Sequence, residues 1–99
     1  MKIEYSHNKP KEEAYEKIST LLNELQKKYT GDISNPQMSW NETKDKMNFS
    51  VSIRGANISG EVYLQDKRII LDGKLPFLAR MFSGQIEGRI RKELEALLA

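Results

Sequence analysis

Two successive stretches of this chain, residues 47–54 and 58–65, alternate apolar with polar side chains at a strict period of two. That period is typical of a β-strand with one buried face and one solvated face. Only residues 55–57, Gly-Ala-Asn, separate the two stretches, and this composition favours a turn. Because parallel strands need long crossovers, so short a link predicts an antiparallel sheet with one apolar face.

Three shorter stretches extend this sheet. Residues 1–6 and 37–41 alternate in the same way, and residues 68–72 follow a tight reversal at Asp66-Lys67. We expect a loop at Asp32–Pro36 before the second of these strands. We also expect the N-terminal strand to pair with the last strand and so close one edge of the sheet.

Two segments have helical spacing instead. Between Pro10 and Tyr29 the apolar residues recur on one face, which predicts a single helix of about five turns. After Pro76, apolar residues step by four along a second helix, and Ser83-Gly84 is expected to kink or divide it. The predicted buried stripe of this second helix consists of Leu78, Phe82, Ile86, Ile90, Leu94 and Leu98.

The predicted order is strand, helix, four strands, helix, within one α+β domain spanning residues 1–99. A sheet with one apolar face must cover that face, and these two helices are the available covers. We therefore expect both helices on one face of an antiparallel sheet. The C-terminal helix should lie across its concave side, as in a reduced helix-grip-like fold.

Composition excludes several classes of function. The chain has no cysteine and a single histidine, so the usual zinc ligand sets and thiol chemistry are missing, and we expect no metal or cofactor. A net charge of +2, with both signs interspersed, predicts no nucleic-acid surface. No apolar run is long enough to span a bilayer, and the missing disulfides favour the cytoplasm.

No catalytic constellation is visible, so we expect no enzyme. His7 follows Ser6, but adjacent strand residues point to opposite faces and cannot form a nucleophile–base pair. We expect His7 to be a surface residue at the end of a strand.

The most unusual segment is residues 75–82, Leu-Pro-Phe-Leu-Ala-Arg-Met-Phe, which Lys74 precedes. A helix buries only part of its circumference, and Phe77 and Met81 lie off the Leu78–Phe82 line. The segment is either core at a strand–helix junction or a hydrophobic contact surface. The residues of that candidate surface are Leu75, Phe77, Leu78, Met81 and Phe82.

Patterns along almost the whole chain carry a family resemblance: Ile3-x-Tyr5-x-His7, Ala14-x-x-x-Ile18, Trp40, Asn57-Ile58-Ser59-Gly60-Glu61-Val62, Leu75-Pro76-Phe77-Leu78 and Ile86-Glu87-Gly88-Arg89-Ile90. On these residues the chain resembles the small bacterial polyhydroxyalkanoic acid system proteins, the polyhydroxyalkanoate granule-region family. The resemblance implies a place near storage-polyester metabolism and brings no catalytic residues.

Two hypotheses of function remain open. The first is a non-enzymatic association protein whose candidate contact surface touches a polyester granule, a granule protein or a second copy of the chain in a homodimer. The second is a binder of a small acyl or lipid-like ligand, held in a groove between the C-terminal helix and the sheet. The residues expected to line that groove are Met38, Trp40, Phe49, Val62, Phe82 and Ile86.

Overall fold

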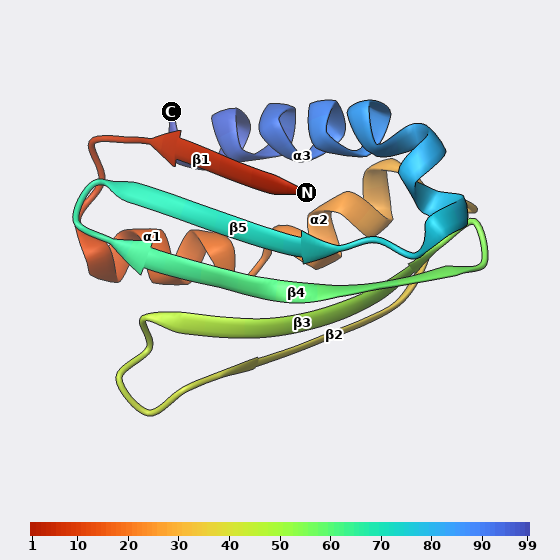
Figure 1. Ribbon diagram of the computed structural model, residues 1–99. Coiled ribbons are helices and arrows are strands. Elements are labelled where there is room, and N and C mark those ends of the chain that lie inside the picture. Colours follow the sequence, from red (N-terminus) through yellow and green to blue (C-terminus); the bar gives the residue numbers. More distant parts are fainter.

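The computed structural model covers residues 1–99 and packs helices against one face of a five-stranded antiparallel sheet (Figure 1). The α+β class predicted from the sequence is confirmed. The strands are β1 Lys2–Ser6, β2 Ile33–Trp40, β3 Lys46–Ile53, β4 Ala56–Gln65 and β5 Arg68–Lys74. The helical elements are α1 Lys11–Ile18, α2 Leu21–Lys28, the 3₁₀ helix η1 Phe77–Phe82 and α3 Ser83–Leu98.

The strands lie in the order β1-β5-β4-β3-β2, so the last four form a meander and β1 adds to its free edge. The expected pairing of the first strand with the last is confirmed, with Ile3 opposite Leu71. Within the meander, Phe49 of β3 faces Gly60 of β4 and Val51 faces Ile58. The alternating pattern therefore sets the register that directs the apolar side chains to one face.

β2 begins earlier than predicted, at Ile33, and the expected loop at 32–36 is wrong. Its pairing with β3 shifts register between Ser34 and Gln37, and Asn35 has a left-handed backbone with φ of 51°. Pro36 also lacks a backbone N–H for the ladder. This irregular start breaks the period of two, which explains why the sequence pattern did not extend to it.

The N-terminal helix is divided into α1 and α2 rather than continuous. At the break, the Ser19 hydroxyl donates to the carbonyl of Tyr15 at 2.8 Å, and the Thr20 hydroxyl donates to that of Lys17 at 2.8 Å. Ser and Thr side chains compete with the backbone for such carbonyls. The apolar face nevertheless continues across the break, because Ile18 and Leu21 are both fully buried.

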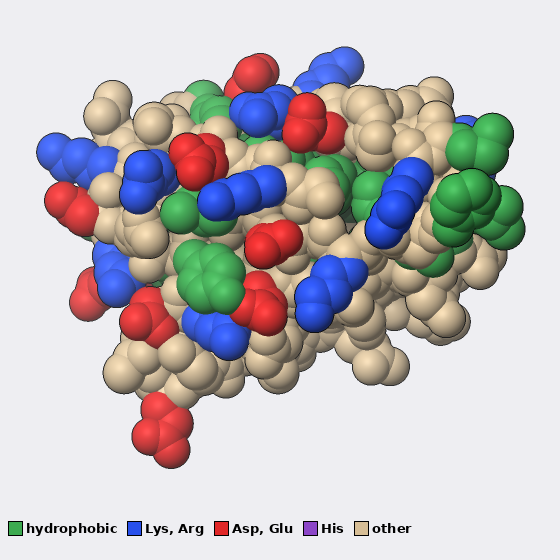
Figure 2. Space-filling view, viewed as in Figure 1, with side chains coloured by type: hydrophobic (Ala, Val, Ile, Leu, Met, Phe, Trp, Pro, Cys, Tyr) green, Lys and Arg blue, Asp and Glu red, His purple; other side chains and the backbone are tan.

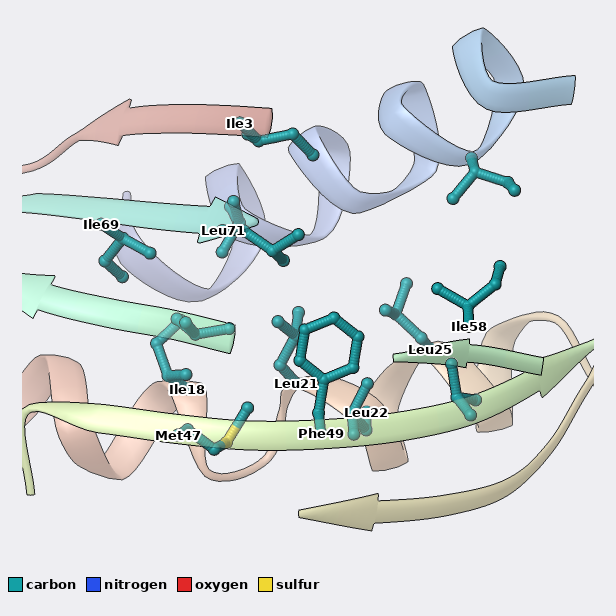
Figure 3. Close-up of a cluster of buried hydrophobic side chains, with 14 of the residues drawn as sticks. Ile3, Ile18, Leu21, Leu22, Leu25, Met47, Phe49, Ile58, Ile69 and Leu71 are labelled. Atoms are coloured by element: carbon teal, nitrogen blue, oxygen red, sulfur yellow. The ribbon is translucent and has the colours of Figure 1, made fainter. Parts of the chain in front are cut away.

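One interior lies between the sheet and the helices. Figure 3 shows Ile3 of β1, Leu21 of α2 and Phe49 of β3 among the side chains that gather there. α3 runs beside β1 (Figure 1), and its Arg91 guanidinium donates to the carbonyl of Glu4 at 3.4 Å. The buried hydrophobic cluster has 19 members: Ile3, Ala14, Ile18, Leu21, Leu22, Leu25, Ile33, Met47, Phe49, Val51, Ile58, Val62, Leu64, Ile69, Leu71, Ala79, Ile86, Leu94 and Leu98.

Candidate functional site

The segment that joins β5 to α3 is a 3₁₀ helix, not the first turns of an α-helix. It begins after Pro76, whose carbonyl accepts the backbone N–H of Ala79 at 2.9 Å. A 3₁₀ helix has three residues per turn, so residues three apart lie on one side. Ala79, fully buried, and Phe82, half-buried, form the inner side of η1.

The remaining large apolar residues of η1 point to solvent. Phe77 is 79% exposed, Leu78 is 68% exposed and Met81 is 79% exposed. We call these three residues the apolar knob. In Figure 2, hydrophobic side chains gather at the right-hand end of the molecule, where Figure 1 places the segment between β5 and α3.

The structure separates the five residues of the candidate contact surface. Phe77, Leu78 and Met81 protrude, whereas Leu75 and Phe82 are half-buried and pack against the core. The expected place of Leu78 on the buried stripe is wrong, because that stripe assumed a helical period of 3.6 residues. Of the other residues of this stripe, Ile86, Leu94 and Leu98 are buried, and Phe82 and Ile90 are half-buried against the core.

A set of charged contacts fixes the base of η1. The Arg54 guanidinium lies 5.8 Å from the centre of the Phe82 ring. Asp32 accepts from Arg89 at 3.2 Å and lies 3.5 Å from Arg54, so one carboxylate joins α3 to the β3–β4 turn. The hydrogen bond from Arg89 holds the pKa of Asp32 below its usual value, and the nearby Arg54 adds to the effect.

Two cations lie beside the knob. Lys74, at the end of β5, and Arg80, within η1, are both exposed and neither forms an ion pair. They line an open surface cleft of about 730 Å³ together with Leu75, Ser83 and Glu87. Figure 2 shows basic side chains next to the hydrophobic group at this end.

The six residues of the expected ligand groove do not form one lining. Phe49, Val62 and Ile86 border an apolar cavity of about 50 Å³ between the helices and the sheet. Met38 is 37% exposed on the edge strand, and Phe82 belongs to the base of η1. These two residues therefore lie outside the cavity.

Trp40, the sixth of these residues, also lies outside the cavity. Its ring packs on Tyr15 with the ring centres 4.7 Å apart. Its indole N–H donates to the Ser19 hydroxyl at 3.1 Å, at the break between α1 and α2. Trp40 thus links the edge strand to the divided helix.

His7 is buried, so the expectation of a surface histidine is wrong. Its Nδ1 accepts the backbone N–H of Lys9 at 3.0 Å, which places the ring proton on Nε2, and that atom is buried without a partner. Burial lowers the pKa of His7 despite an opposing effect of Asp66. Burial therefore favours the neutral form of the imidazole.

The sequence pattern did not indicate the burial of one acidic residue, Glu93. Glu93 of α3 is buried and accepts from the Lys28 ammonium of α2 at 2.7 Å. This hydrogen bond raises the pKa of Lys28. The partners are 65 residues apart, so no local pattern could reveal the pair.

The structure has no group of three or more His, Asp or Glu side chains that could hold a metal ion. None of its helices combines the length and the apolar character that crossing a membrane requires.

The fold and its surface define a small α+β protein with an antiparallel sheet covered on one face and an apolar knob at one end. The family described as "Putative polyhydroxyalkanoic acid system protein" matches residues 1–98. The chain belongs to this family, as its resemblance indicated. Comparison with curated proteins and with solved structures gave no match.

Proposed function

We propose that this protein is a non-enzymatic association protein whose apolar knob contacts a hydrophobic polyester granule or a protein on such a granule. The observation that carries the proposal is the exposure of Phe77, Leu78 and Met81 on one short segment, at 79%, 68% and 79%. Large apolar groups gathered on a surface mark interaction sites more often than isolated ones. Membership of a polyhydroxyalkanoic acid system family supports a polyester as the partner.

The knob can contribute useful binding energy. Full burial of a Phe, Leu or Met side chain stabilises by roughly 1.5–3 kcal/mol, so three together supply on the order of 6 kcal/mol before the costs of association. Its base is held by buried Ala79 and by Arg54 over Phe82. The segment that carries the knob is therefore held in place before binding, and the three exposed side chains are what loses conformational freedom when the knob binds.

The test is sedimentation of the purified protein with polyhydroxyalkanoate particles. We expect the double variant Phe77→Ser/Met81→Ser to bind at least about tenfold more weakly, since two of the three side chains lose their transfer energy. Met38→Ser is the matched control, because Met38 is the other exposed large hydrophobic residue and lies on β2, outside η1. Equal binding of the wild type and the double variant would show that the apolar knob is not the contact surface.

Granule protein and bare polymer are separated in the same experiment. Particles made from purified polymer carry no protein, so binding to them supports direct contact. Binding only to particles that retain their coat, and still dependent on Phe77 and Met81, supports a granule protein as the partner. Both outcomes assign the role to the knob.

A second candidate function is binding of a small acyl or lipid-like ligand. The observation that favours it is the apolar cavity of about 50 Å³, which 14 hydrophobic residues and Arg89 line. Pockets for such ligands usually measure several hundred Å³, so an acyl chain would require α3 to move away from the sheet. Fatty acids that raise the melting temperature and shift Phe49 and Ile86 signals in NMR spectra would support this candidate.

We also propose that the protein acts by binding and not by catalysis. Its single histidine, His7, is buried, and the Nε2 of this residue has no hydrogen-bond partner. The protein acts in the cytoplasm. A homodimer through the knob would bury the same three side chains, and mass measurement in solution over a range of concentrations tests it.

A further inference from the structure

We propose that the apolar knob also enters anionic lipid layers, and that Lys74 and Arg80 recognise their charge. This inference rests on the proposed function of the knob as a contact surface and goes beyond it to a second kind of surface. The starting observation is the position of the two cations. Lys74 is the last residue of β5, and Arg80 lies within η1.

Neither of these two cations is held in a close contact within the protein; the charge of Lys74 only adds to the hydrogen bond from Tyr63 that lowers the pKa of Glu61. Two other cations near the base of η1, Arg54 and Arg89, are both paired with Asp32. Lys74 and Arg80 form no ion pair. The acid that shares their cleft, Glu87, is 3.9 Å from Arg91. Two exposed cations beside three exposed apolar side chains match a surface that is apolar inside and negative outside.

The shape of the knob favours a fluid layer over a protein partner. A stable protein interface buries about 800 Å² on each side, with some 20–30 residues and a matching surface. The knob is three protruding side chains on a six-residue 3₁₀ helix. A lipid layer needs no preformed pocket, because its molecules rearrange around an inserted side chain.

The position of the cations suits this arrangement. Arg80 lies between Leu78 and Met81 in the sequence and is exposed like them. Long basic side chains keep the charged group at the polar boundary while their apolar stems and neighbours enter the layer. Lys74 borders the same open cleft as Arg80, so both ammonium and guanidinium groups can face phosphate or carboxylate headgroups.

The experiment is sedimentation with vesicles of neutral phosphatidylcholine and with vesicles containing about 30% phosphatidylglycerol. A Lys or Arg near an anionic surface contributes roughly a fivefold gain in affinity, so we expect Lys74→Gln/Arg80→Gln to bind the anionic vesicles about 30-fold more weakly than wild type. Binding to neutral vesicles should stay within about twofold. Added salt should weaken wild-type binding to the anionic vesicles only.

Lys11→Gln/Lys92→Gln is the matched control, because both lysines are exposed, neither forms an ion pair, and the net charge falls by the same amount, from +2 to 0. It should keep most of the anionic preference, since Lys11 begins α1 and Lys92 lies in the second half of α3. Equal loss in both double variants would overturn the inference and assign the effect to net charge.

The failure of this inference is distinguishable from failure of the proposed function. If wild type binds polyester particles through Phe77 and Met81 but shows no preference for anionic vesicles, the inference is wrong and the proposed function stands. If Phe77→Ser/Met81→Ser binds both particles and anionic vesicles as well as wild type, both are wrong. A preference that requires Lys74, Arg80, Phe77 and Met81 together supports both.

Discussion

η1 and α3 are consecutive in the chain and carry apolar residues at similar spacing, but the burial of these residues differs. In α3, Leu94 and Leu98 are buried against the sheet and the other helices. In η1, Leu78 lies on the same step-of-four line and is 68% exposed. The difference lies in the helical period: three residues per turn bring Ala79 and Phe82 inward and turn Leu78 away.

The comparison shows that an apolar pattern decides burial only together with the backbone period. The 3₁₀ segment places a small residue, Ala79, against the core and leaves large residues outside. This arrangement is the reverse of the one usual in a surface helix, where the largest apolar side chains are buried. An arrangement that exposes Phe77 and Met81 beside a well-packed core is consistent with a role in contact.

The largest expected difference between the two segments is in stability. Leu94→Ala should lower the free energy of unfolding by about 3 kcal/mol, because the residue is fully buried and leaves a cavity. Leu78→Ala should change it by less than about 0.5 kcal/mol, as for other exposed side chains. Urea denaturation of both variants measures this, and similar losses would contradict the 3₁₀ packing.

A second substitution tests the inner side of η1. Ala79→Leu should cost about 2 kcal/mol, because three more carbon atoms must fit where the methyl group is already fully buried. The same urea experiment measures the change. A neutral effect would mean that position 79 can reach solvent, and the period of three would be wrong.

Much of the difference between η1 and α3 could not have been predicted from the sequence, in contrast to the central strands. The alternation in 47–54 and 58–65 predicted β3 and β4 well, because solvent and core impose a period of two on a one-sided sheet. The division at Ser83 was anticipated, but not the 3₁₀ form of what precedes it. Apolar residues at positions 78 and 82 fit the step of four of a buried α-helical stripe. They fit core residues at a strand–helix junction equally well.

Long-range contacts explain the other omissions. The burial of His7 depends on the turn between β4 and β5, where its backbone N–H donates to the carbonyl of Lys67 at 3.0 Å. The pairing of Lys28 with Glu93 depends on how α2 and α3 meet. For the candidate site, the sequence identified Phe77 and Met81 from their position off the predicted stripe. The spatial separation of Met38 and Trp40 from the cavity required the fold.

A smaller expected effect is a pH dependence of the stability, which arises from His7 and not from the apolar knob. Because burial lowers the pKa of His7 in the folded state, its neutral form stabilises the protein above the unfolded value of about 6.5. That contribution is lost as pH falls from about 6.5 through the folded pKa, since the unfolded chain binds the proton more readily. The resulting loss of stability should be modest.

The measurement is urea denaturation between about pH 7 and pH 5, the range in which histidine charges. We expect His7→Gln to flatten the profile there, because His7 is the sole histidine of the chain. The carboxylates with lowered pKa, Asp32, Asp45 and Glu61, act at lower pH. An unchanged slope in the variant would show that His7 is not held neutral. Binding through the knob should not follow this profile.

The most direct test of the central claim is NMR of protein labelled at the methionine methyl groups. Met81 is 79% exposed, Met38 is 37% exposed and Met47 is fully buried, so a soluble paramagnetic agent should broaden their signals in that order. With polyester particles or anionic vesicles added, we expect protection from the agent at Met81 and little change at Met38. A Met81 signal as sheltered as that of Met47 in the free protein, or no protection at Met81 on binding, would contradict the account.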